Sequence, residues 1–376
     1  MKTSKKLVIA ALTAVAVASS SSMASAATLR AAGASSVQTF FDKCKAAYVA
    51  KTGDEMPYNG QGSGSGKTAI GNGTVDLAFS DDENKNAVKP ADMIHIPFAA
   101  WPVAVMANLP NSRQLNLSTE TIAKIFAGQI TKWNDPAIVA DANKTYKVPV
   151  YKKKNGETVL DKNGAPVVLR FKNVRTYYTL PNKDIVVIYR NASSGTSANF
   201  TTALNKLHPS IWTKAGNGTF TTAFPGTLTS SFRGGSNSTA IAQLAKDTKY
   251  SITYNEVSYA RDYNLRTINV INPAGNAVAP ATEGVLAAFS IADIREDGVV
   301  TFNYTSTQPS QYPFSATTYA MVLTKYSSAS LAKSIRDFVE FHAFECPAVS
   351  NIGFSEITKA SELGKVITKQ VARIGN

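Results

Sequence analysis

Gly62-Ser63-Gly64-Ser65-Gly66 is the stretch from which the fold of this chain is best read, because it joins a strand-like run to a predicted helix over residues 67–71. Two similar turns, rich in small residues, also stand where a predicted strand passes into a helix: Ala32 to Ser36, and Arg190 to Thr196. The start of a helix exposes unpaired backbone N–H groups and the positive end of the helix dipole. Glycine lets the backbone approach a ligand, and hydroxyls add donors. Three such starts at one point would bind a small, dehydrated oxyanion.

Strands and helices alternate around the first two turns. Short strands are predicted at residues 28–32, 56–58, 75–79, 94–98 and 103–107. Ser35 or Ser36 is expected to cap a helix that Gly53 ends. One face of that helix is apolar: Val37, Phe40, Phe41, Cys44 and Tyr48. The alternation predicts an α/β fold that binds ligands at the carboxyl ends of its strands.

The second half of the chain continues the pattern with one interruption. Ser118 starts a predicted helix that Gly128 ends, and residues 185–189 form a buried strand that runs into the third turn. Further helices are expected after that turn, at residues 239–245, and at residues 331–342 before Pro347, with a strand at residues 252–254. Residues 146–171 differ, since two Asn-Gly dipeptides stand between strand-like runs there. They predict a hairpin region.

The first 26 residues have the composition of a signal peptide. Lys2, Lys5 and Lys6 precede an apolar run from Leu7 to Ala18, and Ala24-Ser25-Ala26 is a small-residue cleavage site. The apolar run is too short to span a bilayer. We therefore expect cleavage after Ala26 and a periplasmic or secreted protein.

Cleavage would leave 350 of the 376 residues, a length that usually forms two domains. The formal net charge of +13 would become +10, because the removed segment carries three lysines and no acid. Such a charge favours an anionic ligand or surface, although an ordinary basic exported protein would also show it. The basic residues are scattered apart from Lys152-Lys153-Lys154, and no nucleic-acid motif accompanies them, so binding to nucleic acid is not expected.

Cys44 and Cys346 are the two cysteines of the chain. In an oxidising compartment a single pair predicts a disulfide. Two separate thiols are the alternative.

Asp81 ends a predicted buried strand close to the second turn. A carboxylate would repel a fully ionised anion, but it accepts a hydrogen bond from an anion that carries a proton. Asp81 would therefore select phosphate over sulfate. The alternative is that Asp81 caps the next helix or pairs with a lysine.

Arg190 ends the strand before the third turn, and a planar guanidinium suits bidentate contact with an oxyanion. A surface arginine paired with an acid is the alternative. Ser194, Gly195 and Thr196 offer hydroxyls and helix-start N–H groups, or simply form an ordinary N-cap.

Enzyme motifs are incomplete in this sequence. Gly66-Lys67-Thr68 ends like a P-loop, but Gln61 stands where a P-loop needs glycine. No serine lies in a G-x-S-x-G motif. The histidines lack metal-ligand spacing, and His342 on an apolar helix face is expected in the core: His95, His208 and His342. No catalytic activity, metal or cofactor is predicted.

Several segments together resemble a known family. They are residues 58–67 followed by Val75-Asp-Leu-Ala-Phe-Ser-Asp81, the helix of residues 117–133, the turn Arg190 to Ser197, and residues 234–259. They are similar to the periplasmic phosphate-binding protein of the bacterial phosphate ABC importer and to the related DING proteins. The similarity covers most of the chain after residue 26.

The resemblance implies a ligand set for phosphate. Ser35 matches the threonine of the family's first loop, and Ser36 matches its backbone donor. The remaining positions match in order: Ser63, Asp81, Arg190, Ser194, Gly195 and Thr196. Ala192 stands where the family has an aspartate that orients the arginine.

The resemblance also implies the type II periplasmic-binding-protein fold, in which two α/β lobes joined by two hinge crossings close on the ligand. Lobe one would comprise residues 27–100 and 314–376, and lobe two residues 101–313. Both cysteines would then lie in lobe one, which favours the disulfide. The basic hairpin near residues 146–171 looks like an insertion relative to the family, and the sequence assigns no role to it.

The function implied is capture of inorganic phosphate by a non-enzymatic monomer that serves the membrane permease of a phosphate ABC importer. One alternative is a secreted phosphate-binding protein with an adhesive or surface role, which the charge and the basic insertion favour. A secreted phosphatase is the other, and the lack of metal-ligand spacing argues against it.

Overall fold

A computed structural model describes residues 26–110 and 113–375. The signal-peptide segment therefore lies outside the described residues, apart from Ala26. None of the helices in the described ranges has the length and apolar character that a membrane span requires.

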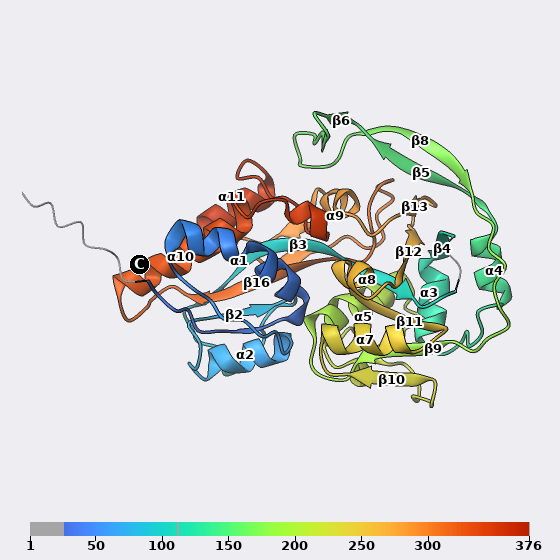
Figure 1. The fold of residues 1–376 in the computed structure, drawn as a ribbon, viewed down its shortest axis with the longest axis horizontal. Coiled ribbons are helices and arrows are strands. Elements are labelled where there is room, and N and C mark those ends of the chain that lie inside the picture. Colours follow the sequence, from blue (N-terminus) through green and yellow to red (C-terminus); the bar gives the residue numbers. More distant parts are fainter. Residues whose placement is uncertain (1–25, 111–112, 376) are drawn as a thin grey trace, which may run out of the picture.

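The centre of the fold is a ten-stranded mixed sheet in the described part of the chain (Figure 1). Along its main path the strands are β1 (Ala31–Gly33), β2 (Leu77–Ser80), β16 (Ser315–Leu323), β3 (Met93–Ala107), β11 (Ser251–Glu256), β9 (Val186–Arg190) and β10 (Phe232–Gly235). Three more strands join beside β3: β12 (Arg266–Ile271), β13 (Ala277–Val278) and β4 (Leu115–Ser118). The parallel pairs β1–β2, β9–β10 and β9–β11 lie on either side of the central antiparallel strands β16 and β3. The predicted α/β class is confirmed.

Strand β3 connects the two halves of this sheet. Its first part, from Met93 to Pro102, pairs with β16, and its last part, from Val103 to Ala107, pairs with β11. The prediction of two separate strands at residues 94–98 and 103–107 is therefore wrong. Pro97 and Pro102 remain inside one strand, and the pairing with β16 shifts register near Pro97, where a missing N–H is tolerated. All residues of β3 are buried, so packing on both faces holds it continuous.

The first helix begins differently from the prediction. Residues 35–37 form a short 3₁₀ helix, η1 (Ser35–Val37), and α1 (Gln38–Thr52) follows with Val37 as an N-cap that makes no side-chain bond. Neither Ser35 nor Ser36 caps α1, because their hydroxyls bond to residues from elsewhere in the chain. The predicted end of the helix is confirmed, since Gly53 has a φ of +76°.

The strand predicted at residues 56–58 is absent from the described structure. This segment instead folds back onto β1: the Tyr58 hydroxyl donates to the Ala34 carbonyl at 2.7 Å, and the Gly62 N–H donates to the Gly33 carbonyl at 2.8 Å. The chain then enters α2 (Ser63–Gly71), which starts four residues earlier than predicted.

The other predicted helices are present. Ser118 caps α3 (Thr119–Phe126) by accepting from the Thr121 N–H, and Ser194 caps α5 (Gly195–Leu207). The remaining helices are α4 (Pro136–Ala142), α6 (Phe220–Ala223), α7 (Ser238–Asp247), α8 (Ser258–Asp262), α9 (Thr282–Phe289), α10 (Ala329–Phe344), η2 (Val349–Ile352) and α11 (Glu362–Val371). A small sheet pairs β14 (Asp293–Ile294) with β15 (Val300–Thr301).

The predicted hairpin region is confirmed as a separate ribbon that arches over the body of the protein (Figure 1). Strands β5 (Thr145–Tyr151) and β8 (Val168–Arg175) pair with each other, and β6 (Lys153–Lys154) pairs with β7 (Glu157–Thr158) across the first Asn-Gly turn. Asn155 and Gly156 both have positive φ, of +52° and +87°, as a tight hairpin turn needs.

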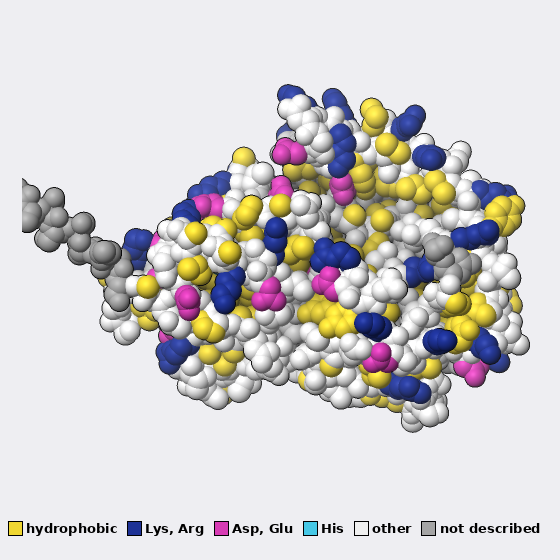
Figure 2. All heavy atoms as spheres, in the orientation of Figure 1, with side chains coloured by type: hydrophobic (Ala, Val, Ile, Leu, Met, Phe, Trp, Pro, Cys, Tyr) yellow, Lys and Arg dark blue, Asp and Glu magenta, His cyan; other side chains and the backbone are white. Residues whose placement is uncertain are grey.

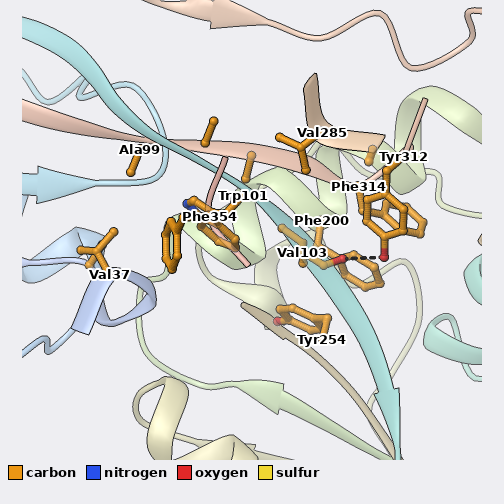
Figure 3. Packing of buried hydrophobic residues seen from close by; sticks show 14 of the residues in the cluster. Val37, Ala99, Trp101, Val103, Phe200, Tyr254, Val285, Tyr312, Phe314 and Phe354 are labelled. Atoms are coloured by element: carbon orange, nitrogen blue, oxygen red, sulfur yellow. Dashed lines mark hydrogen bonds between the residues drawn. The ribbon is translucent and has the colours of Figure 1, made fainter. Parts of the chain in front are cut away.

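The hydrophobic core runs without interruption through both halves of the sheet. Figure 3 shows Trp101 and Val103 of β3 between Phe354 on one side and Phe200 and Tyr254 on the other. The Tyr312 hydroxyl donates to the Val103 carbonyl at 3.1 Å, which holds the segment before β16 against β3.

Cys44 of α1 and Cys346, just after α10, form a disulfide across 302 residues of sequence. The predicted pairing is therefore confirmed. His342, at the end of α10, is a core residue as expected: its Nδ1 lies 2.8 Å from the Phe338 carbonyl, and burial lowers the pKa of the imidazole to about 3.

Candidate functional site

The eight predicted site residues lie together at the starts of three helices. Ser35 and Ser36 belong to η1, Ser63 is the first residue of α2, and Gly195 and Thr196 open α5. Asp81 directly follows β2, and Arg190 is the last residue of β9. Each serine, threonine and charged residue of the set is at least 97% buried. Sequence positions as far apart as 35 and 196 thus meet because β9 runs opposite to β1 and β2 along the sheet, so the carboxyl ends of these strands face each other where β3 passes from β16 to β11.

Asp81 is the hydrogen-bond acceptor at the centre of one group of site residues. Its Oδ1 accepts from the Ser36 hydroxyl at 2.7 Å, and its Oδ2 accepts from the Thr196 hydroxyl at 3.0 Å. The Asp81 N–H donates to the Ser63 hydroxyl at 3.1 Å, and the first helix turn of α5 supplies Asn199, which donates to the Asp81 carbonyl at 2.6 Å. Burial raises the pKa of the carboxyl to about 6, although the bonded hydroxyls act in the opposite direction.

Asp81 is neither a helix cap nor the partner of a lysine. The nearby Lys67 pairs with Asp82 instead, at 2.5 Å. The carboxylate of Asp81 is therefore held by neutral hydroxyl groups, and its charge is not cancelled by a bonded cation.

Arg190 is the cation at the centre of a second group of site residues. Its Nη1 donates to the hydroxyls of Ser35 and Ser194, each at 3.2 Å, and its Nε donates to the Ser236 carbonyl at 3.2 Å. None of these partners is an acid, so Arg190 is not the surface ion pair that was its alternative. Burial lowers the pKa of the guanidinium.

The third guanidinium nitrogen of Arg190, Nη2, differs from the two that donate hydrogen bonds. Nη2 is buried and has no hydrogen-bond partner among the described residues. A Cβ atom at Gly62 would lie 2.9 Å from this nitrogen, and Gly62 has a φ of +122°. Glycine is thus needed for the start of α2 to come this close to the guanidinium. A buried donor without a partner costs free energy unless a ligand accepts from it.

Ser194 combines the two functions predicted for it as alternatives. Its hydroxyl accepts from the Ser197 N–H at 3.2 Å, which makes it the N-cap of α5, and it also accepts from Arg190. The cap therefore fixes the helix start and the arginine relative to each other.

Two further residues of the site were missed in the sequence. Ser238, at the start of α7, donates its N–H to the Ser35 hydroxyl at 3.1 Å, so a fourth helix start joins the other three. Thr318 lies within β16 and donates to Asp81 Oδ1 at 2.7 Å. Gly234-Gly235 followed by polar residues before a helix was a usable signal for Ser238. Thr318 had no signal, because only the pairing of β16 with β2 and β3 brings it to Asp81.

A cavity of about 950 Å³ reaches Asp81. Its lining comes from both halves of the sheet, with Lys67 and Asp82 near α2, and Ser193 and Asn199 near α5. Of the eight predicted site residues, Asp81 alone lines this cavity.

The chemistry of the site is that of a receptor for a small oxyanion. Helix-start N–H groups, hydroxyls and one guanidinium are donors, and Asp81 is the single carboxylate acceptor among them. Such a set binds an anion that still carries a proton. In the described ranges there is no group of three or more His, Cys, Asp or Glu side chains that could hold a metal ion.

Gly195 is the point of closest approach between α5 and Asp81, which gives a first testable prediction. A Cβ atom there would lie 2.6 Å from Ser63 Oγ and 2.8 Å from the Asp81 backbone nitrogen. We expect Gly195→Ala to lower the free energy of unfolding by about 1–3 kcal/mol, because the backbone must shift. Urea denaturation measures this effect.

Gly226→Ala is the matched control, because its Cβ would meet only a ring carbon of Phe224 at 3.4 Å. Equal stability losses in the two variants would show that the tight packing at Gly195 is not the cause.

Comparison with known proteins assigns the chain to a family. Residues 18–344 match the model of the PBP superfamily domain. The phosphate-binding protein PstS of Haemophilus influenzae is 31% identical over 310 residues, which cover 81% of this chain and 80% of that protein. Phosphate-binding protein PstS 2 of Mycobacterium tuberculosis is 30% identical over 328 residues, which cover 83% of this chain and 78% of that protein.

Among solved structures, the high-affinity periplasmic phosphate-binding protein PfluDING, bound with phosphate, has a similar fold. Its TM-score is 0.64 at 22% identity, over 93% of this chain and 99% of that one. The two-lobed α/β fold of periplasmic binding proteins, expected from the sequence, is thereby confirmed. By the superfamily domain and the PstS relatives, the chain belongs to the PstS phosphate-binding protein family of the PBP superfamily.

Proposed function

We propose that this protein captures inorganic phosphate and passes it to the membrane permease of a phosphate ABC importer. The observation that carries the proposal is Arg190, a fully buried guanidinium whose direct partners are all neutral and whose Nη2 has no partner among the described residues. A buried cation in this position is stabilised by an anion that binds beside it. The PstS relatives agree with phosphate as that anion.

The proposed ligand set is the one predicted from the sequence. Arg190 would contact the phosphate oxygens with its forked nitrogens, and the hydroxyls and helix-start N–H groups would donate to the other oxygens: Ser35, Ser36, Ser63, Ser194, Gly195 and Thr196. Asp81 would accept the remaining proton of the phosphate. Ala192 leaves Arg190 without the aspartate that the family places there, and the Ser236 carbonyl and two serine hydroxyls orient the guanidinium instead.

Asp81 gives the proposal a test of selectivity. We expect Asp81→Asn to reduce the discrimination between phosphate and sulfate, because the amide can donate to an anion that has no proton to give. Titration calorimetry of the variant with both anions measures the ratio of the two dissociation constants. Each decade lost in this ratio corresponds to about 1.4 kcal/mol.

Asp82→Asn is the matched control, since this neighbouring carboxylate pairs with Lys67 and lies outside the proposed ligand set. If Asp81→Asn rejects sulfate as strongly as the parent protein does, the role assigned to Asp81 is wrong.

The proposed lobes follow the prediction, with residues 27–100 and 314–376 in one and residues 101–313 in the other. In support, β3 exchanges its partner β16 for β11 between Pro102 and Val103, and β16 begins at Ser315. These two places would be the hinge crossings. Arg190 and Thr196 of the proposed second lobe already bond to Ser35 and Asp81 of the first, so opening about these crossings would admit the anion and closure would enclose it.

The proposal includes export to the periplasm, action as a monomer and absence of catalysis. Calorimetry of the purified exported protein, stripped of bound anions, with phosphate, arsenate and sulfate tests the binding function. Turnover of a phosphomonoester by the same preparation would favour an enzyme instead. Sedimentation equilibrium tests the monomer.

A further inference from the structure

The hairpin formed by β5 and β8 is the most strongly charged segment of the protein. Residues 145–175 contain eight basic and two acidic residues, a formal net charge of +6, whereas the whole chain carries +13. All eight basic residues are exposed: Lys147, Lys152, Lys153, Lys154, Lys162, Arg170, Lys172 and Arg175. Figure 2 shows their dark blue side chains along the top of the view. The proposed phosphate site uses none of them.

Apolar side chains are exposed on the same ribbon. Five large hydrophobic residues are exposed in the described ranges, and three of these lie between positions 169 and 177: Leu169 at 63%, Phe171 at 37% and Tyr177 at 55%. In Figure 2 yellow side chains accordingly lie among the blue ones at the top of the molecule. Apolar and cationic side chains are therefore both exposed on this ribbon, and its exposed residues between positions 147 and 177 are called the hairpin surface below.

The strand register explains which face points outward. Tyr146 pairs with Val174, and this pair lies on the face that turns toward the body, since Tyr146 is buried. Pro149 pairs with Phe171 on the opposite face. Leu169 is the extra residue of a bulge between two pairs of the ladder, and a bulge redirects a side chain. Phe171 and Lys147 therefore lie on the outward face, whereas Arg170 and Lys172 lie on the same face as Tyr146. Leu169 is exposed at the bulge.

The far end of the ribbon is fastened to the body. Lys153 pairs with Glu283 of α9 at 2.9 Å, and the Thr158 hydroxyl donates to the same carboxylate at 2.9 Å. Lys152 and Lys154, on either side of Lys153, have exposed side chains that form no ion pair with the residues that the structure describes. The hairpin surface is thus presented on a support that is attached at both ends, so little ordering is needed when it binds.

We infer that the hairpin surface binds the surface of a bilayer that contains anionic phospholipids. Lysine and arginine side chains are attracted to the phosphate groups of such lipids, while leucine and aromatic side chains insert at the boundary between headgroups and acyl chains. A soluble polyanion would satisfy the cations but would offer nothing to Leu169 and Phe171. The co-location of the two kinds of side chain therefore favours the lipid surface over an acidic protein or a nucleic acid.

Sedimentation of the purified exported protein with vesicles tests the inference at low salt. We expect binding to vesicles of phosphatidylcholine mixed with phosphatidylglycerol, and little binding to phosphatidylcholine alone. Added salt should weaken the binding, because it screens the attraction. Lys152→Glu with Lys154→Glu should lower the vesicle partition coefficient by about tenfold or more. Leu169→Ser with Phe171→Ser should lower it by about tenfold at unchanged charge.

Lys43→Glu with Lys45→Glu is the matched control, because it makes the same change of charge at exposed positions of α1. It should leave most of the vesicle binding intact, and phosphate affinity should be unchanged in all three double variants. The inference is overturned if the anionic vesicles do not bind the parent protein, or if the control loses as much binding as the hairpin variant. It is also overturned if the Leu169 and Phe171 variant binds like the parent, since the partner would then be any polyanion.

Discussion

Arg190→Ala is expected to weaken phosphate binding by about 10- to 100-fold. A hydrogen bond to a charged group contributes about 1.5–3 kcal/mol, and 1.4 kcal/mol is one decade in the dissociation constant. The guanidinium is buried, so water cannot replace it as a donor, and the hydroxyls of Ser35 and Ser194 lose their shared partner at the same time. Titration calorimetry of stripped protein with phosphate measures the change.

Arg233→Ala is the matched control, because Arg233 is exposed on the neighbouring strand β10. It should bind phosphate like the parent protein. Thermal unfolding without phosphate shows whether Arg190→Ala is folded. A folded Arg190→Ala protein with unchanged affinity would place Arg190 outside the ligand set.

Ala192→Asp extends this test, since it restores the acid that the family has at this position. A carboxylate here would offset part of the positive charge of Arg190, so phosphate affinity should change measurably.

Loss of the disulfide is expected to have the largest effect on stability. We expect Cys44→Ser combined with Cys346→Ser to lower the free energy of unfolding by about 2–5 kcal/mol, because the bridge restricts the unfolded chain over a long loop. The loop spans 302 residues of sequence. Urea denaturation of the exported protein measures the loss. Phosphate affinity should be retained, because neither cysteine contacts the proposed ligand set.

Counting thiols on unfolded, unreduced protein is the decisive control. Two free thiols per chain would rule out the bridge in the exported protein. Reduction of the parent protein should reproduce the stability of the double variant, whereas a stability loss in the variant alone would point to the serine substitutions.

Several local features of the fold could be predicted from the sequence alone, although the expected cap of the first helix was not. Ser118 starts its helix as predicted, and Ser194 is the N-cap that was considered as an alternative to a ligand role. Gly53 and the Asn155-Gly156 turn adopt the positive φ that their residue types favour. The hairpin was also predicted from local signals.

Asp81, Arg190 and the turn Ser194 to Thr196 were proposed as site residues from their places at strand ends and a helix start, which have recognisable local signals. The ligand roles of Ser35, Ser36 and Ser63 came from the family resemblance.

Tertiary structure decided what depends on contacts between distant segments. Met93 to Ala107 forms one strand because β16 and β11 pair with its two parts in succession, although two separate strands were predicted. Residues 56–58 are not a strand because Tyr58 and Gly62 bond to the end of β1 instead.

The candidate site also has features that the sequence predicts and features that only the tertiary structure decides. Local signals predicted that Asp81 and Arg190 lie at strand ends. Only the fold shows that hydroxyl groups surround Asp81 and that Arg190 bonds to hydroxyls and not to an acid. Thr318 reaches Asp81 across 237 residues of sequence. Backbone preferences act over a few neighbouring residues, so they can be predicted from the sequence. Packing between distant segments, which only the folded chain brings together, produces the burial of the site, the raised pKa of Asp81 and the unpaired nitrogen of Arg190.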